Sequence, residues 1–426
     1  MRLEELYQLY LKSTGVSTDT RHIEEGQLFF ALKGDRFNGN HWAQQALDHG
    51  AIYAIIDERE HLNNDRMILV DDVLSCLQQL AGYHRLQYKN PVIGLTGSNG
   101  KTTTKELIHL ILSDENDVNT TAGNYNNHIG LPLTLLKGNL DQDFWLVEMG
   151  TNSPGEIELL CEIAQPNFGL ITNIGAAHLE KLINLDGVYQ EKTSLFRSVL
   201  ASNGSIFVNR GDDYLKSFDT AKRSITYTTD SCGFGDLRLK ESKSHLYFEL
   251  IDDQGGLHEF KSNLVGRYNQ DNISAALTVG AYFGVPIESA IKAINSYLPD
   301  NMRSQLKQTD HNLLVLDTYN ANPTSMKASI LSFIQSDYEA PLCIIGDMLE
   351  SGAQGLDQHK EIEELLIRFD VPYYLVGHSF AAVSDHAFDH VDSLKAYLVD
   401  QGLIKNKTVL LKASRGIALE RLLDLF

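Results

Sequence analysis

The chain has 426 residues, of which 43% are hydrophobic and 22% are charged, and its formal net charge is −20. This length exceeds the size at which one hydrophobic core keeps growing, so two or three domains are expected. The acidic balance argues against general affinity for nucleic acid, whose phosphates would be repelled by this surface. The four cysteines are scattered without CxxC spacing, which disfavours a zinc site or a disulfide framework.

The first residues, MRLEELYQLYLKS, predict a short amphipathic helix. They include acidic residues and no small-residue cleavage site, so a signal peptide is not expected. No apolar run approaches the length needed to span a bilayer. We therefore expect a cytoplasmic protein without membrane contact, and a monomer as the default state.

The first section of the chain, residues 1–89, predicts a small α/β domain. GQLFFALKG is typical of a strand, HWAQQALDHG of a helix and AIYAIID of a second strand, which is the order of a βαβ unit. The helical stretch SCLQQLAGYHRL then leads to KNP, where Pro91 indicates a boundary.

The second and third sections, residues 90–303 and 304–426, both alternate strands with helices. In the second, PVIGLT, FWLVEMG, FGLITNIG and GSIFVNR have few charges, which is typical of a parallel sheet covered on both faces. SHLYFELIDDQGGLHEF instead indicates an antiparallel hairpin or meander, and a helix is expected over about 269–283. In the third, LLVLDTY, PLCIIGD, YYLVG and TVLLKAS predict a doubly wound, Rossmann-like domain.

The most informative motif is PVIGLTGSNGKTTTKELIHLIL, a strand followed by a glycine-rich turn, Lys-Thr and a helix. Gly97 and Gly100 allow a tight turn with inward N–H groups, and the helix N-terminus favours an anion. Lys101 would neutralise the β- and γ-phosphates of a nucleotide, and the Thr102 hydroxyl would ligate Mg²⁺. Leu95 replaces the first glycine of the strict GxxxxGK[ST] pattern. The motif predicts a nucleoside triphosphate rather than an ordinary turn, and it leaves the reaction open.

A phosphate loop of this type needs a metal-binding acid at the end of a neighbouring strand. Glu148 follows the apolar run FWLV, so its carboxylate is expected at the sheet edge and is predicted to bind the metal. His178 follows the strand FGLITNIG, and a lone histidine is more often structural than catalytic. Lys192, in YQEKTSLF, has the pattern of an ordinary exposed helix lysine.

These motifs occur in one order together with TAGNYNNHIGLPLTLL, VEMGTNSPGEIELL, GRYNQDN and LDTYNANPTSM. The ordered set, from about Ser17 to Arg415, resembles the Mur ligases of peptidoglycan synthesis and, among them, the ligases that add D-Ala-D-Ala. The resemblance implies an ATP-dependent enzyme that joins D-Ala-D-Ala to UDP-MurNAc-tripeptide through an acyl phosphate. It assigns the first domain to the UDP-sugar, the central domain to ATP and the third domain to the amino substrate.

The resemblance also implies roles for single residues. Lys101, Glu148, His178 and Lys192 would form the catalytic centre; Thr102, Glu148 and His178 would bind Mg²⁺, and a carbamylated Lys192 would bind a second Mg²⁺. ATP contacts are implied for Gly97, Ser98, Asn99, Gly100, Lys101, Thr102, Thr103, Asn272, Arg303, Asp317 and Asn320. Substrate contacts are implied for Asp19, Thr20, Arg21, Lys33, Gly34, Asn124, Asn126, Asn127, Ser414 and Arg415.

Two alternatives stay open at this point. A ligase of the same family that adds the third residue often carries a DNPR motif, which this chain lacks, whereas YNANP favours addition of D-Ala-D-Ala. A non-catalytic nucleotide-binding relative is the other alternative. It would be expected to lose at least one catalytic residue, and this chain retains them all. The identity of the third peptide residue, diaminopimelate or lysine, is not specified by the sequence.

Overall fold

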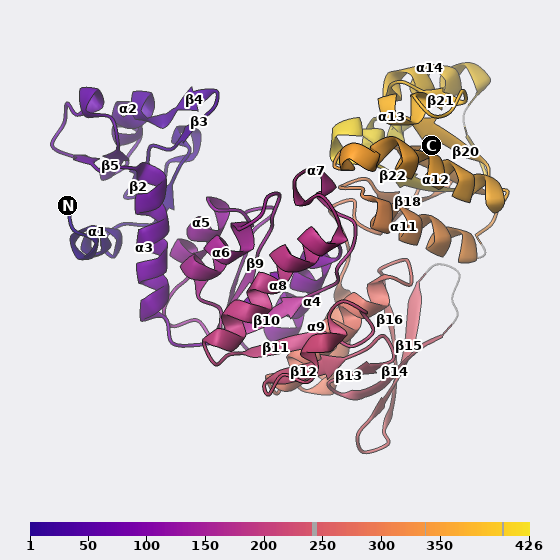
Figure 1. The fold of residues 1–426 in the computed structure, drawn as a ribbon, viewed down its shortest axis with the longest axis horizontal. Coiled ribbons are helices and arrows are strands. Elements are labelled where there is room, and N and C mark those ends of the chain that lie inside the picture. Colours follow the sequence, from indigo (N-terminus) through magenta and orange to yellow (C-terminus); the bar gives the residue numbers. More distant parts are fainter. Residues whose placement is uncertain (241–244, 337, 403) are drawn as a thin grey trace.

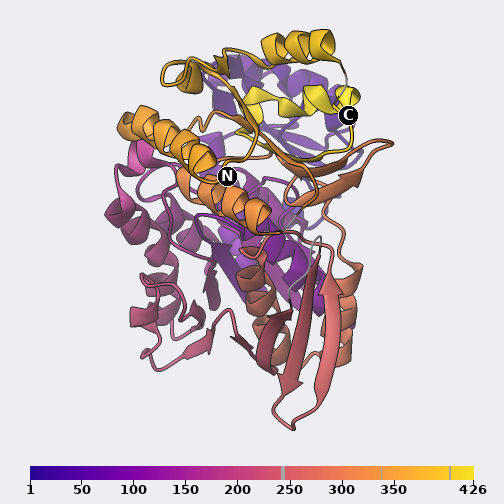
Figure 2. The same ribbon diagram turned by 90° about the vertical axis from the view of Figure 1, so that its right-hand side faces the viewer.

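The computed structural model describes residues 1–240, 245–336, 338–402 and 404–426, which form three units in chain order (Figure 1). In Figure 1 the indigo N-terminal unit lies at one side, the magenta central unit in the middle and the orange-to-yellow C-terminal unit at the other side. Figure 2 shows the C-terminal unit above the central unit, with a small antiparallel sheet at the opposite end. No helix within the described residues is long and apolar enough to cross a membrane.

The N-terminal unit is built on a four-stranded parallel sheet with the order β1-β2-β5-β6. The predicted βαβ order is confirmed by β2, α2 and β5, but a short antiparallel hairpin, β3–β4, separates β2 from α2. The long helix α3 packs against both this unit and the central one. The elements are α1 (Leu3–Tyr10), β1 (Val16–Ser17), η1 (Thr20–His22), β2 (Leu28–Phe30), β3 (Lys33–Gly34), β4 (Phe37–Asn38), η2 (Gly39–Trp42), α2 (Ala43–Asp48), β5 (Tyr53–Ile56), η3 (Arg59–His61), β6 (Met67–Leu69) and α3 (Val73–Gln87).

The central unit contains a six-stranded parallel sheet with the order β12-β11-β10-β7-β9-β8. Its middle strands are fully buried, as their uncharged sequences predict. Successive residues of a strand face opposite sides, and Val92 accordingly packs with α3, α5, α6 and α8 whereas Ile93 packs with α4, α9 and α10. The elements are β7 (Val92–Thr96), α4 (Lys101–Leu112), β8 (Val118–Thr120), α5 (Gly130–Lys137), β9 (Phe144–Glu148), α6 (Glu156–Ala164), β10 (Phe168–Ile171), α7 (Leu179–Leu182), α8 (Leu185–Ala201), β11 (Ser205–Asn209), η4 (Lys216–Phe218) and β12 (Ser224–Tyr227).

A four-stranded sheet, β13-β14-β15-β16, and two helices complete the central unit. All pairs in this sheet are antiparallel, which confirms the predicted hairpin; the first residue of the run that predicts it, at position 244, lies outside the described residues. The helix predicted near 269–283 is confirmed as α9. The elements are β13 (Ser231–Cys232), β14 (Gly235–Lys240), β15 (Leu246–Asp252), β16 (Leu257–Ser262), α9 (Asn269–Tyr282) and α10 (Ile287–Ser296).

The C-terminal unit has a six-stranded sheet with the order β17-β18-β22-β19-β20-β21. Five strands are parallel and carry helices on both faces, as predicted for a doubly wound domain, but the edge strand β17 is antiparallel to β18. The elements are β17 (Gln305–Gln308), β18 (Leu313–Asp317), α11 (Pro323–Gln335), β19 (Pro341–Gly346), η5 (Gly352–Gln354), α12 (Gly355–Arg368), β20 (Tyr373–Val376), α13 (His378–Ala381), β21 (Ala387–Phe388), α14 (Val391–Gln401), β22 (Thr408–Lys412), η6 (Arg415–Ile417) and η7 (Leu419–Leu425).

Candidate active site

A cleft of about 510 Å³ lies where the central unit meets the C-terminal unit. Its walls come from the carboxyl ends of parallel strands in both units, which is where open α/β sheets place their ligands. Most of the residues assigned from the sequence therefore come together in one place. Those that line the cleft are Ser98, Asn99, Gly100, Lys101, Thr102, Thr103, Asn124, Asn126, Asn127, Glu148, His178, Asn272, Arg303, Asp317 and Asn320.

The phosphate loop joins β7 to α4 along one wall of the cleft. Gly97 and Gly100 have φ angles of 147° and 80°, which side chains rarely tolerate. A Cβ at Gly97 would lie 1.8 Å from Thr172 Oγ1, and one at Gly100 would lie 2.3 Å from Asn272 Oδ1. Lys101 Nζ donates to the Gly97 carbonyl at 2.8 Å, and desolvation lowers its pKa. The loop is thus held in a turned conformation with its lysine folded back over the backbone.

Glu148 ends β9 beside the phosphate loop and is 2% exposed. Its Oε1 accepts a hydrogen bond from Asn126 Nδ2 at 2.8 Å and lies 3.5 Å from the Thr102 hydroxyl. Its Oε2 has no hydrogen-bond partner among the described residues, and the nearest cation, Lys105 Nζ, is 4.0 Å away. A buried carboxylate oxygen without a donor, next to a hydroxyl, fits the oxygen ligands that Mg²⁺ prefers.

Lys192 lies on α8 and is completely buried, so its interpretation as an exposed helix lysine is wrong. The helix turns this residue toward the sheet, a choice of face that the local pattern does not reveal. Its Nζ has no hydrogen-bond partner among the described residues. The neighbouring carboxylate of Glu191 accepts from Thr151 Oγ1 at 3.0 Å and from the Gly155 N–H at 2.7 Å. Burial lowers the pKa of Lys192 well below its usual value, and the charge of Lys101 lowers it further.

His178 lies just before α7, with a φ of 55°. Its Nδ1 is 2.8 Å from Oε2 of Glu350, a residue of the C-terminal unit. This contact with His178 is the main cause that holds the pKa of Glu350 below its usual value. Glu350 lines the cleft although it was not among the residues assigned from the sequence.

The segment YNANP connects the C-terminal unit directly to the phosphate loop. Asn322 caps α11 by accepting from the Ser325 N–H at 2.8 Å, and Pro323 occupies the first turn of that helix. Nδ2 of the Asn322 amide donates to Asn99 Oδ1 at 2.8 Å. One residue therefore fixes the start of a helix and touches the phosphate loop.

Tyr319 is a cleft residue that the sequence assignment missed, although it stands between Asp317 and Asn320 in the same motif. The Arg303 guanidinium lies 3.6 Å from the centre of its ring and that of Arg415 lies 5.5 Å from it. Lys412, also missed, is 1% exposed and pairs with Asp317 at 2.6 Å. The position of Arg303 within the cleft therefore depends on an aromatic side chain of the C-terminal unit.

The remaining assigned residues lie outside this cleft. Asp19 lines a second cavity of about 770 Å³ between the N-terminal and central units, and Arg21 pairs with it at 2.6 Å, whereas Thr20 does not line that cavity. Lys33 and Gly34 form β3 and line neither cavity.

Ser414 and Arg415 follow β22 and do not line the cleft either. Ser414 Oγ accepts from the Leu349 N–H at 3.0 Å and lies within hydrogen-bond distance of the Ala321 carbonyl, at 3.3 Å. The described contacts of Ser414 therefore tie two loops of the C-terminal unit together.

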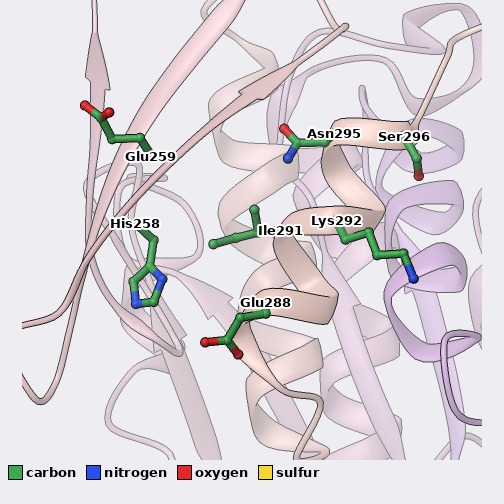
Figure 3. Close-up of a pocket in the computed structure, with 7 residues that line it drawn as sticks. All are labelled: His258, Glu259, Glu288, Ile291, Lys292, Asn295 and Ser296. Atoms are coloured by element: carbon green, nitrogen blue, oxygen red, sulfur yellow. The ribbon is translucent and has the colours of Figure 1, made fainter.

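A third hollow, of about 700 Å³, lies between β16 and α10 and contains none of the assigned residues (Figure 3). Two of its titratable side chains already have partners: His258 Nε2 lies 2.8 Å from Asp252 and Lys292 Nζ lies 3.3 Å from Asp114. In Figure 3 Lys292 extends away from His258, so these groups do not converge on a ligand.

Comparison with known proteins tests the resemblance. Three family models match successive parts of the chain: the Mur ligase family catalytic domain at 12–85, the Mur ligase middle domain at 95–280 and the Mur ligase glutamate ligase domain at 302–415. The UDP-N-acetylmuramoyl-tripeptide–D-alanyl-D-alanine ligase of Bacillus subtilis is 36% identical over 425 residues, which cover 96% of this chain and 92% of the relative. That of Escherichia coli is 32% identical over 422 residues, covering 95% and 92%.

Solved structures match this chain in fold over nearly its whole length. MurF from Acinetobacter baumannii superimposes with a TM-score of 0.85 at 28% identity, covering 98% of this chain and 97% of that one. MurF from Thermotoga maritima, in complex with ADP, also gives 0.85, at 27% identity and with the same coverage. The resemblance drawn from the ordered motifs and the three-unit fold are thus confirmed together: this chain belongs to the Mur ligase family.

Proposed function

We propose that the chain joins D-Ala-D-Ala to UDP-MurNAc-tripeptide with ATP, giving UDP-MurNAc-pentapeptide, ADP and phosphate. The observation that carries the proposal is the single cleft in which Lys101 and Glu148 of the central unit face Arg303, Asp317 and Asn320 near the joint with the C-terminal unit. The names of the relatives in Bacillus subtilis and Escherichia coli support the same reaction. A ligase that adds the third residue is a weaker alternative, because the diaminopimelate ligase among the solved structures is 19% identical and supports the fold alone.

ATP would bind across the two units. The N–H groups of the phosphate loop and Lys101 would hold the phosphates, since they combine a helix N-terminus with a cation. Asn272 and Asn320 would contact adenine, and Asp317 would lie on the ribose side. The ADP bound to the Thermotoga maritima relative supports use of this nucleotide.

The metal ligands that we propose are Thr102, Glu148 and His178. Oε2 of Glu148 supports this assignment, since it is buried without a donor among the described residues and its lone pairs are available to a cation. Mg²⁺ bound there would neutralise negative charge on the phosphates. His178 would contribute through Nε2, because its Nδ1 faces Glu350.

Carbamylation of Lys192 is the finer part of the proposal. A lysine with a lowered pKa carries more of the neutral amine, whose lone pair attacks the carbon of CO₂ to form an N–C bond, with loss of one proton to solvent. The product is an anionic oxygen ligand, available for a second Mg²⁺. Complete burial without a hydrogen-bond partner among the described residues supports this assignment, because an unmodified ammonium would be poorly solvated there.

The reaction requires activation of a carboxylate, which repels nucleophiles and has no good leaving group. A terminal carboxylate oxygen of the tripeptide would attack the γ-phosphorus, and the bond to the β-γ bridging oxygen would break to release ADP. The amine of D-Ala-D-Ala would then attack the acyl carbon, lose a proton and expel phosphate. The first step brings two anions together, so this chain's contribution is mainly positioning and charge neutralisation by Lys101 and Arg303.

The direct test measures phosphate release by the purified chain with ATP and Mg²⁺. We expect release only when both UDP-MurNAc-tripeptide and D-Ala-D-Ala are present, with the peptide ending in lysine or diaminopimelate tried separately. Release that needs UDP-MurNAc-dipeptide and a diamino acid instead would identify a third-residue ligase. ATP binding without release under any combination would identify a non-catalytic relative.

We also propose that the enzyme acts as a monomer in the cytoplasm, where its ATP is available. Measurement of its molecular mass in solution tests whether it is a monomer.

A further inference from the structure

A cluster of metal-ligating side chains lies in the N-terminal unit, outside the ATP cleft. It consists of His41 in η2, Glu58 directly before η3 and His61 at the end of η3. One ligand atom of each residue lies within 4.8 Å of the other two. Among the residues that the structure describes, this is the one set of three or more His, Cys, Asp or Glu side chains with such spacing.

The geometry of the three side chains is convergent. Glu58 Oε2 lies 3.4 Å from His61 Nε2, and the rings of His41 and His61 are 4.9 Å apart, centre to centre, at 63°. The Glu58 and His61 side chains are 23% and 28% exposed, and His41 is exposed, so an ion from solvent has access. Small side-chain rotations would bring the three donors to the separations found around one metal ion.

The carboxylate of Glu58 is held in place by a neighbouring amide. Asn38 Nδ2 donates to both of its oxygens, at 3.0 and 2.8 Å. Asn38 is itself fixed, because its Oδ1 accepts from the N–H and the Nδ2 of Asn40 at 3.0 and 2.9 Å. Each carboxylate oxygen keeps a further lone pair after accepting one bond. Such a supporting hydrogen bond orients a metal ligand and leaves a lone pair of its oxygen available for the ion.

Lys33, a cation close to Glu58, also has a second carboxylate partner. Lys33 Nζ lies 3.6 Å from Glu58 Oε1 but 3.1 Å from Oδ1 of Asp57, whose side chain is 4% exposed. Asp57 is the main cause that raises the pKa of Lys33. Lys33 therefore keeps a partner when Glu58 binds a cation, although its charge lowers the affinity of the site.

We propose that His41, Glu58 and His61 bind a divalent transition metal of the zinc type, in a site separate from the Mg²⁺ site of the cleft. Two imidazole nitrogens and one carboxylate oxygen are a donor set of zinc centres that keep an open position, whereas a Mg²⁺ site takes most of its ligands from oxygen. The scattered cysteines disfavour a zinc site built on thiolates, and this cluster contains no thiolate. The bound ion would link η2 to η3, next to the β3–β4 hairpin that carries Lys33 and Gly34.

The test is a titration of the full chain with Zn²⁺ alone, in a buffer without phosphate or chelators and in excess Mg²⁺. We expect one Zn²⁺ per chain that Mg²⁺ does not displace. His61→Ala and Glu58→Gln are expected to weaken binding at least tenfold, and His386→Ala, at an exposed histidine of the C-terminal unit, is expected to leave it unchanged. Equal affinity of His61→Ala and His386→Ala, displacement by Mg²⁺, or no binding by the wild type would overturn the proposal.

A second measurement on the unaltered chain does not depend on how the variants fold. Trp42 follows His41 directly and is 53% exposed, whereas the other tryptophan, Trp145, is fully buried in the central unit. Co²⁺ bound at the proposed site is therefore expected to quench Trp42 fluorescence, and Zn²⁺ is expected to restore it by displacement. Absence of quenching by Co²⁺, or quenching that Zn²⁺ does not reverse, would place the metal elsewhere.

Discussion

His178 Nδ1 lies 2.8 Å from Glu350 Oε2, which joins the loop after β10 in the central unit to the loop after β19 in the C-terminal unit. Two hydrogen bonds accompany this pair: Asn322 donates to Asn99, and the Ala176 N–H donates to Thr324 Oγ1 at 2.9 Å. These contacts join the two units that line the cleft, so changes in them should alter substrate binding.

Glu350→Gln should raise KM for ATP and D-Ala-D-Ala about fivefold. It removes the carboxylate from an ion pair that is partly exposed and hence contributes about 1 kcal/mol. Because the pair lowers the pKa of Glu350, its contribution is complete above the usual carboxyl pKa and is lost as the pH falls through the lowered value. The difference between the variant and the wild type should therefore be constant near neutral pH and shrink in acid.

Steady-state kinetics of Glu361→Gln provides the control for Glu350. Glu361 pairs with Lys327 at 2.6 Å on the surface of the same unit, and both side chains are well exposed. Equal KM values in the two variants would show that the contact with His178 has no part in substrate binding.

Glu148→Gln should lower kcat by about a hundredfold or more, in line with the loss of an electrostatic stabiliser in an enclosed site. The amide is close in size to the carboxylate, so the thermal unfolding midpoint should change little. Phosphate release measured over a range of Mg²⁺ concentrations should show weaker dependence on the metal. An unchanged Mg²⁺ dependence would contradict the assignment of Glu148 as a ligand.

Lys192→Ala should abolish turnover and leave room beside the buried face of α8 for a small anion. If a carbamate acts there, acetate or propionate should restore part of the activity in the variant and have no effect on the wild type. Lys181→Ala, an exposed lysine on α7, should behave like the wild type. A ¹³C resonance of a carbamate after exposure of the wild type to ¹³CO₂ provides independent evidence. Its absence, together with failure of rescue, would rule out the modification.

His359 gives a prediction about pH and stability. It is 1% exposed; its Nδ1–H donates to the Gly355 carbonyl at 2.6 Å, and its Nε2 accepts from the Met348 N–H at 3.0 Å. Burial lowers its pKa below the usual 6.5. The unfolded chain therefore binds a proton first as the pH falls below 6.5, so stability is complete at neutral pH and declines in acid by up to about 1.4 kcal/mol per pH unit.

Thermal unfolding of His359→Gln between pH 7 and pH 5 tests this contribution. The variant should be less stable at neutral pH and should lose less stability on acidification than the wild type. His386→Ala, at an exposed site, should keep the wild-type slope. An unchanged slope in His359→Gln would assign the acid sensitivity to other groups.

The sequence allowed prediction of the features that depend on neighbours in the chain. The phosphate loop is contiguous, so Gly97, Gly100 and Lys101 reveal it without a structure, and Glu148 follows from its place at the end of an apolar strand. The burial of Lys192 could not be predicted in this way, because it depends on which face of α8 meets the sheet. The residue ranges of the three domains stay predictions.

Contacts between distant segments account for what was missed. Glu350 and His178 come from different sheets, and no local pattern links them. Tyr319 could have been found, since it stands inside a motif whose neighbours were assigned. Asn322, in the same motif, has a capping role that its position before Pro323 indicates, but its bond to Asn99 requires the docking of two units.

The polar junction between the central and C-terminal units has a consequence for turnover. The hydrogen bonds of Asn99 and Ala176 and the ion pair of His178 each contribute about 0.5–3 kcal/mol. Their sum is smaller than the free energy that a large apolar interface contributes. A product enclosed by such contacts can leave when a few of them break, without unfolding either unit. The residence time of ADP should therefore depend on the sum of these small terms, so each weakened contact should speed release while it impairs capture of the next ATP.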